Sequence, residues 1–153
     1  MPVFLSHKRE DSEATLRIAS YLRNAGITCY VDVLDPSIKS TDDLTSLLRD
    51  RIHKCTHLMA VVSSYTTQSW WVPFEIGIGT EIDRRITSYQ LSSVALPDFL
   101  TKWPILHNES DLGYFVALYR QDASVPLSEG RTFQANVSSA SSFHTVLKTL
   151  LKQ

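Results

Sequence analysis

The stretch of this chain best suited to chemistry is Trp71-Val72-Pro73-Phe74-Glu75, which places one carboxylate a helical turn beyond an indole. Proline is tolerated only in the first turn of a helix, so Pro73 predicts a helix that begins near Trp70 and carries Glu75 close to its start. The apolar run from His57 to Val62 predicts a buried strand just before it. A helix that follows such a strand begins at the edge where open α/β sheets bind ligands.

A single acid backed by an aromatic ring at that edge can stabilise a positively charged sugar ring. The alternative is a structural role, in which Glu75 merely favours the N-terminus of the helix through the macrodipole.

The elements that must position this stretch alternate between short apolar runs and amphipathic segments. The pattern predicts strands over Pro2–Ser6, Ile27–Val33, His57–Val62, Ile86–Leu91 and Trp103–Leu106. It also predicts a helix capped by Asp11 and stopped by Gly26, a second capped by Ser40 or Thr41, a third from about Trp70 to Arg85, a fourth over Asp111–Tyr119, and a last one with Phe143, Val146, Leu147 and Leu150 on its apolar face. This alternation is typical of an α/β fold with a largely parallel sheet.

Composition bounds the fold and its partners. The 153 residues, of which 43% are hydrophobic, are enough for one domain with its own core, so residues 1–153 are predicted to form a single domain. Residues 121–142 are rich in serine and other polar types and predict a loop before a C-terminal helix. A formal net charge of −1 gives no overall field that would attract nucleic acid or an anionic membrane.

The cysteines, the histidines and the N-terminus predict a metal-free cytoplasmic protein. Cys29 and Cys55 stand in apolar patterns without metal-ligand spacing, so buried reduced thiols are expected. No pair of histidines has ligand spacing on a helix, and no metal site is predicted. The first residues are too quickly polar for a signal peptide, and no apolar run approaches the length of about 20 residues that a membrane span needs.

Four segments together resemble the Toll/interleukin-1 receptor (TIR) domain family, in the same order and at similar intervals. They are Phe4-Leu5-Ser6-His7-Lys8, Tyr30-Val31-Asp32, Val61-Val62-Ser63-Ser64 and Ser69-Trp70-Trp71-x-x-x-Glu75. The resemblance covers roughly residues 2 to 90. It implies a flavodoxin-like three-layer fold, in which a five-stranded parallel sheet of order 2-1-3-4-5 has helices on both faces.

Many members of the TIR family cleave NAD⁺ with the glutamate that matches Glu75. The resemblance therefore implies that NAD⁺ is a substrate rather than a cofactor, that no cofactor is needed, and that Glu75 is the catalytic residue. A freestanding domain of this size resembles the signal-producing subunit of bacterial antiphage systems such as Thoeris, which make a cyclic ADP-ribose isomer for a separate effector protein. Contacts between TIR domains in a homo-oligomer are also implied.

The substrate-binding residues that the resemblance implies come from all four segments and from the loop after the second strand. They are Leu5, Ser6, His7, Lys8, Asp32, Lys39, Ser64 and Trp71. The turn from Ser6 to Arg9 offers a hydroxyl, backbone amides and two cations that can hold a pyrophosphate, although a solvated basic turn explains it nearly as well. His7 departs from the family pattern, in which tyrosine is common, so stacking of a ring at this position is in doubt.

Two other classes of function fit the same strand order. A non-catalytic TIR adaptor works by self-assembly and needs no acid at position 75, so the presence of Glu75 disfavours this class. A two-component receiver needs an acidic pair at the end of the first strand to hold Mg²⁺. Here that end is followed by His7-Lys8-Arg9, and the receiver is rejected.

Overall fold

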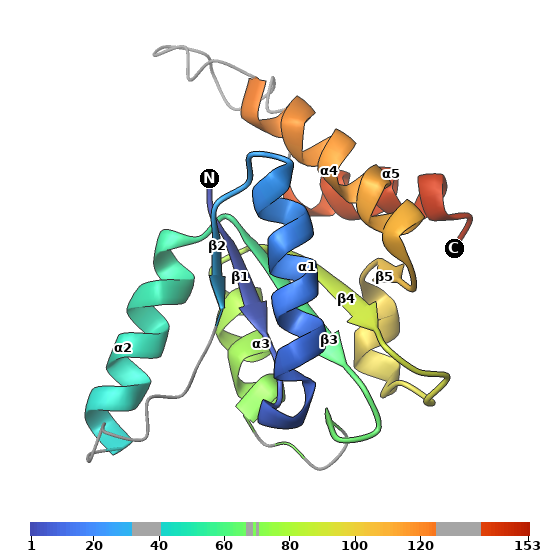
Figure 1. The fold of residues 1–153 in the computed structure, drawn as a ribbon. Coiled ribbons are helices and arrows are strands. Elements are labelled where there is room, and N and C mark those ends of the chain that lie inside the picture. Colours follow the sequence, from blue (N-terminus) through green and yellow to red (C-terminus); the bar gives the residue numbers. More distant parts are fainter. Residues whose placement is uncertain (32–40, 67–68, 70, 125–138) are drawn as a thin grey trace.

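Five parallel strands form the central sheet of the protein (Figure 1). The computed structural model describes residues 1–31, 41–66, 69, 71–124 and 139–153. The strands are β1 (Val3–Ser6), β2 (Cys29–Val31), β3 (His57–Val62), β4 (Arg85–Gln90) and β5 (Ile105–Leu106). Their spatial order is β2-β1-β3-β4-β5, which confirms the predicted flavodoxin-like fold.

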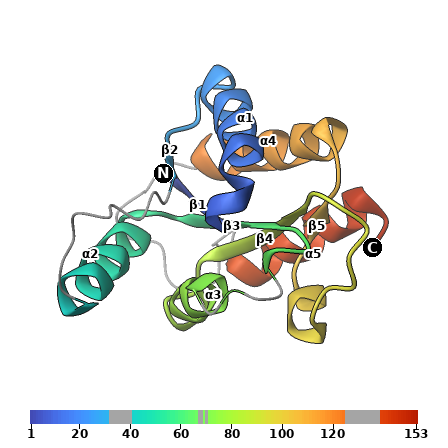
Figure 2. The same cartoon turned by 60° about the horizontal axis from the view of Figure 1, so that its bottom comes forward.

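Helices cover both faces of this sheet, as Figure 2 shows. They are α1 (Ser12–Asn24), α2 (Thr41–Lys54), α3 (Trp71–Glu81), α4 (Glu109–Ser124) and α5 (Ala140–Leu151), with short 3-10 helices η1 (Arg9–Asp11) and η3 (Asp98–Lys102). Side chains from α1, α4 and α5 build one apolar cluster against the sheet, and those from α2, α3 and η3 build the other. The two clusters and the sheet between them make the three layers.

The central strand β3 shows why its sequence is an unbroken apolar run. All six of its residues are buried, with Met59 and Val61 in the first cluster and Leu58, Ala60 and Val62 in the second. Alternate side chains of a strand point to opposite faces, so a strand covered on both faces has no polar face to display.

Helix α3 packs closely on β3 and ends earlier than predicted. A Cβ added at Gly79 would lie 3.0 Å from Leu58 Cδ1, so glycine allows the close approach of helix and strand. The helix ends at Glu81, not near Arg85, because Asp83 takes a left-handed conformation with φ of 52°. Arg84 N–H then donates to the carbonyl of Gly79 at 2.9 Å and closes the helix end.

Two further predictions near the C-terminus were wrong. Residues 121–124, predicted as the start of the polar loop, continue α4, and residues 140–142, predicted as its end, begin α5. Val146 and Leu150 were assigned to the apolar face of the last helix, yet they are 45% and 40% exposed. The buried stripe of α5 is narrower than the apolar face predicted from the sequence. It consists of Ala140, Phe143 and Leu147.

Both cysteines are free and buried, as predicted. Burial raises the pKa of Cys29 and of Cys55 to about 11, so each remains a protonated thiol at neutral pH.

Candidate active site

Glu75 lies on the buried face of α3 and points at the end of the first strand. Its side chain is fully buried, and its Oε2 accepts a hydrogen bond from the Ser6 hydroxyl. Ser6 is the last residue of β1 and is also fully buried. The carboxylate therefore sits at the carboxyl edge of the sheet, between the first strand and α3.

Ser69 and Pro73 determine where α3 starts. The Ser69 hydroxyl accepts hydrogen bonds from the backbone N–H groups of Trp71 and Val72, at 3.3 and 3.4 Å, and so caps the helix. Pro73 falls in the first turn, where its missing N–H costs nothing. The buried face then comprises Val72, Glu75, Ile76 and Gly79, so the acid takes a position that would otherwise be apolar.

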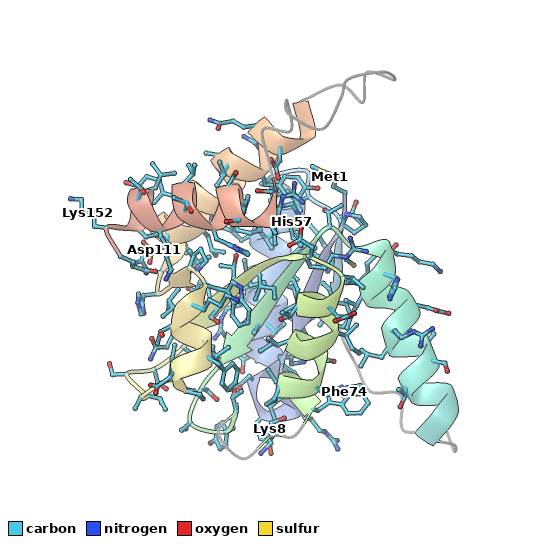
Figure 3. All side chains as sticks on the ribbon, turned by 180° about the vertical axis from the view of Figure 1, so that it is seen from behind. Met1, Lys8, His57, Phe74, Asp111 and Lys152 are labelled. Carbon is cyan, nitrogen blue, oxygen red and sulfur yellow. The ribbon has the colours of Figure 1, made fainter. Side chains whose placement is uncertain are left out.

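The aromatic side chain predicted beside the acid packs on a neighbour in the same helix. The Trp71 ring is half-buried and lies 5.6 Å from the ring of Phe74, which is 42% exposed. Figure 3 shows Phe74 and Lys8 at the same end of the molecule, away from His57 and Met1. Two aromatic rings and one cation thus border the end of the sheet that holds Glu75.

His7 is directed at the start of α1 and is only 7% exposed. Its Nε2 lies 3.2 Å from the Ser12 hydroxyl, which itself donates to the carbonyl of Arg9 at 2.6 Å. Because that hydroxyl hydrogen is used, His7 Nε2 must be the donor of the pair. The ring is nearly covered in this structure and presents little surface for stacking.

Lys8 remains a surface cation next to this edge. Its Nζ lies 3.6 Å from the Glu10 carboxylate and 6.0 Å from the centre of the Tyr65 ring. The side chain is 25% exposed, and the Tyr65 ring is exposed. Because the Glu10 partner is 45% exposed, this ion pair adds little stability, and Lys8 can turn toward an anionic ligand at small cost.

A second buried acid, Asp11, was predicted only as a helix cap. It stands at the N-cap position of α1, but its side chain makes no capping bond. Instead, the carboxylate accepts a hydrogen bond of 2.7 Å from the Ser63 hydroxyl. The Ser63 oxygen also accepts from the N–H of Tyr65 at 3.1 Å. This network ties the turn after β1 to the loop after β3. Asp11 and Ser63 are 52 positions apart in the sequence, so no local pattern reveals their contact.

The remaining predicted substrate-binding residues are placed as follows. Leu5 is fully buried in the first apolar cluster, so only its backbone faces the strand end. Ser64 is exposed in the turn after β3. Asp32 and Lys39 lie outside the described residues. In the described part of the chain, no three His, Cys, Asp or Glu side chains are grouped so as to hold a metal ion.

A mainly apolar cavity of about 340 Å³ lies on the side of α3 that faces η3. Val72 and Ile76 of α3, Ser63 and Thr66 of the preceding loop, and Leu100 of η3 are among its walls. Its size is at the lower end of the range of small-molecule pockets, about 300–1,000 Å³. Glu75 does not line it, because the carboxylate is turned toward β1.

The fold and this arrangement at the sheet edge agree with a comparison to protein families. The model of the family described as "TIR domain" matches residues 3–123, so the chain belongs to the TIR domain family. Among curated proteins, the chain is 27% identical over 88 residues to the "Probable 3' cyclic ADP-D-ribose synthase ThsB'" of Bacillus cereus (strain MSX-D12). That match covers 55% of this chain and 46% of the relative, less than half of its length.

Solved structures show the same fold. The TIR domain of the Toll-related receptor TRR-2 from Hydra magnipapillata superposes with a TM-score of 0.63 and 19% identity, over 78% of this chain and 95% of that one. A 2-deoxyribosyltransferase from Bacillus psychrosaccharolyticus gives a TM-score of 0.61 with 11% identity, over 73% of this chain and 90% of the other. At these identities the likeness concerns the fold alone. Within the described residues, every helix is too short or too polar to cross a membrane.

Proposed function

We propose that this TIR domain consumes NAD⁺ by breaking the bond between nicotinamide and ribose, with Glu75 as the catalytic residue. The observation that carries the proposal is the buried Glu75 carboxylate at the carboxyl edge of the sheet, which accepts a hydrogen bond from the hydroxyl of Ser6. Membership of the TIR family and the name of the Bacillus relative support the same conclusion.

One carboxylate is sufficient for this reaction. When the C1′–N1 bond breaks, its electron pair returns to the pyridinium nitrogen, and nicotinamide leaves as a neutral molecule. The leaving group therefore needs no general acid, whereas ordinary glycosidases use two carboxyl groups. Glu75 accepts hydrogen bonds from ribose hydroxyls and opposes the positive charge that grows at C1′.

In this proposal, the Ser6 hydroxyl makes the hydrogen bond to Glu75 that a ribose hydroxyl makes once substrate is bound. A buried carboxylate is costly unless it is hydrogen-bonded, so Ser6 stabilises the ionised form while no substrate is bound. Bound substrate takes over this bond, and one hydroxyl donor replaces another. The substrate-binding roles of Lys8, Ser64 and Trp71 near this edge, and of Asp32 and Lys39, belong to the same proposal.

Capture of the ribosyl cation decides the product. Attack by water releases ADP-ribose and one proton, and attack by a nucleophile in the adenosine half of the same molecule closes a ring. The name of the Bacillus relative, a probable cyclic ADP-ribose synthase, favours the cyclic product. We propose that the product acts in the cytoplasm as a signal for a separate effector protein in antiphage defence, and that the domain assembles with copies of itself.

Purified protein incubated with NAD⁺ at low and at high protein concentration tests the activity. Chromatography measures free nicotinamide and separates ADP-ribose from its cyclic isomers. Glu75→Ala is expected to lower the rate of nicotinamide release by at least about 10²–10³, the usual effect of removing one preorganised electrostatic group. Glu81→Ala is the matched control, since Glu81 is an exposed acid at the far end of the same helix.

Two outcomes contradict the proposal. The assignment of Glu75 is wrong if a folded Glu75→Ala protein releases nicotinamide at the wild-type rate. If concentrated or filamentous wild-type protein releases none, the chain is instead a non-catalytic adaptor that acts by homotypic assembly.

A further inference from the structure

A second pocket, of about 400 Å³, opens at the opposite edge of the sheet from Glu75. Arg84 in its wall directly precedes β4, and Trp103 lies two residues before β5, so the pocket lies where these strands begin. The last turns of α3, η3 and the first turns of α5 enclose it. Three segments far apart in the sequence thus meet around one hollow.

The charges in this pocket are unbalanced. Arg84, Lys102 and Lys148 line it together with a single carboxylate, that of Asp83. Three cations and one anion leave two positive charges, although the whole chain carries a formal net charge of −1. The pocket is therefore a local cationic site on a slightly acidic protein.

Neutral carbonyl groups hold two of these cations, Arg84 and Lys148, in place. Lys148 Nζ donates to the carbonyl of Thr101 at 2.7 Å, and Arg84 Nη2 donates to the carbonyl of His53 at 2.7 Å. Among the described residues, Arg84, Lys102 and Lys148 form no ion pair with a carboxylate within 4.0 Å. Arg84 Nε is buried and has no hydrogen-bond acceptor among the described residues. Arg84 and Lys148 are therefore held in position, and no carboxylate among the described residues neutralises their charge in an ion pair.

His144 adds a neutral donor to the same wall. Its Nε2 accepts a hydrogen bond of 2.8 Å from the N–H of Ile86, so the ring proton is on Nδ1. The pKa of His144 is lowered to about 4, mainly by burial. The positive charges of Arg85, Lys102 and Lys148 also lower this pKa, and the negative charge of Asp83 opposes the shift. At neutral pH the ring is therefore uncharged and offers an Nδ1–H.

From this geometry we infer that the pocket binds the phosphate group of a small molecule. A phosphate dianion matches the two unbalanced positive charges, and its oxygens accept from ammonium, guanidinium and imidazole donors alike. The phosphate is either free inorganic phosphate or part of a nucleotide, for which the pocket has room. Because the pocket and Glu75 lie at opposite edges, phosphate binding can be tested in the absence of NAD⁺ and without any turnover.

Nuclear magnetic resonance of the whole chain tests this site. Inorganic phosphate is titrated at pH 7.5, with ionic strength held constant by sodium chloride, while the Ile86 amide and the His144 ring are observed. Saturable shifts are expected at both groups, together with a rise in the pKa of His144, since a nearby dianion favours the imidazolium.

Two conservative variants probe the cations. Lys102→Gln and Lys148→Gln are each expected to weaken phosphate binding by about fivefold, and glutamine at 148 can still donate to Thr101. Arg17→Ala is the control. Arg17 lies on α1 with its side chain 69% exposed, so this substitution removes one positive charge away from the pocket. Tighter binding of AMP than of phosphate identifies a nucleotide as the source of the group, and equal binding identifies free phosphate.

The inference is overturned if phosphate produces no saturable shift, or if sodium chloride alone produces the same shifts. It is overturned equally if both lysine variants, shown to be folded by their spectra, keep the wild-type affinity, or if Arg17→Ala weakens binding as much as they do.

Discussion

Ser6 and Glu75 form a buried pair that joins the first strand to α3. A carboxylate removed from water is stable only with donors around it, and a serine hydroxyl is a small donor that a larger ligand can replace. The pair therefore stabilises the folded protein in the absence of substrate, and in the proposed reaction Ser6 gives way to the substrate.

Ser6→Ala tests the pair. The free energy of unfolding should fall by about 1–3 kcal/mol, the usual cost of leaving a buried polar group without one of its partners. Urea denaturation measures the loss. In a Glu75→Ala background the same substitution should cost much less, because the hydroxyl no longer has its acceptor. Equal losses in both backgrounds would mean that the two side chains are not coupled.

Only part of this site was predictable at the level of single residues. Pro73 and the strand before it placed Glu75 at the carboxyl edge, and the resemblance named Ser6. The bond between Asp11 and Ser63 was not predictable, because Asp11 also satisfies the pattern of a helix cap and its true partner lies in a distant loop. A local pattern shows which residues can cap a helix, but not which of them are recruited elsewhere.

At the scale of elements, α3 is the helix on which the site depends. Its two glycines differ in surroundings, since a Cβ at Gly77 would meet nothing within 4 Å and one at Gly79 would press on Leu58. Leu58 is only 1% exposed and has little room to move.

This contrast predicts different effects of the same substitution. Gly77→Ala should raise the free energy of unfolding by about 0.5–1 kcal/mol, because alanine favours the helix. The free energy of unfolding of Gly79→Ala should be at least about 1 kcal/mol lower than that of Gly77→Ala, because the new methyl group displaces a buried side chain. Thermal unfolding of both variants measures the difference. An equal gain in stability would show that α3 does not pack on β3 as described.

Elements with a single strong signal were predicted best. The bounds of β3 were predicted correctly because an apolar run flanked by polar residues leaves no other interpretation. The apolar face of α5 was predicted too wide, since periodicity identifies the residues that are able to be buried, and the neighbouring elements decide how many are. The length of α4 was underestimated because its last turn is polar, and the sequence does not show that the Asp122 side chain in this turn is only 6% exposed and paired with Arg85.

At the scale of the whole molecule, the buried His57 and the half-buried His144 are expected to make stability depend on pH. His57 is fully buried and packs against the rings of Phe115, Tyr119 and Phe143. Burial, with smaller effects of Arg85, the N-terminus and His144, lowers the pKa of His57 well below 6.5. His144 is shifted in the same direction, from 6.5 to about 4.

These shifts predict a loss of stability in acid. Below about pH 6.5 the histidines of the unfolded chain bind protons that the folded chain does not, so stability falls as pH falls. For His144 the loss extends down to about pH 4 and amounts to about 3 kcal/mol. Urea denaturation between pH 7.5 and 4 measures the slope.

His144→Gln should flatten this slope, because glutamine still accepts from the N–H of Ile86 and does not titrate. His107→Gln is the matched control, since His107 is exposed. If the slope is the same in both variants, His144 does not bring about the acid sensitivity.

Helix α3 begins beside Ser6 at one rim of the sheet and ends beside the phosphate pocket at the other. Its 11 residues make a stiff rod of about 16 Å. A helix of this length moves as one rigid body, so we expect a ligand that displaces its last turn to displace Glu75 as well. The proposed phosphate site and the proposed active site are therefore joined by one short helix.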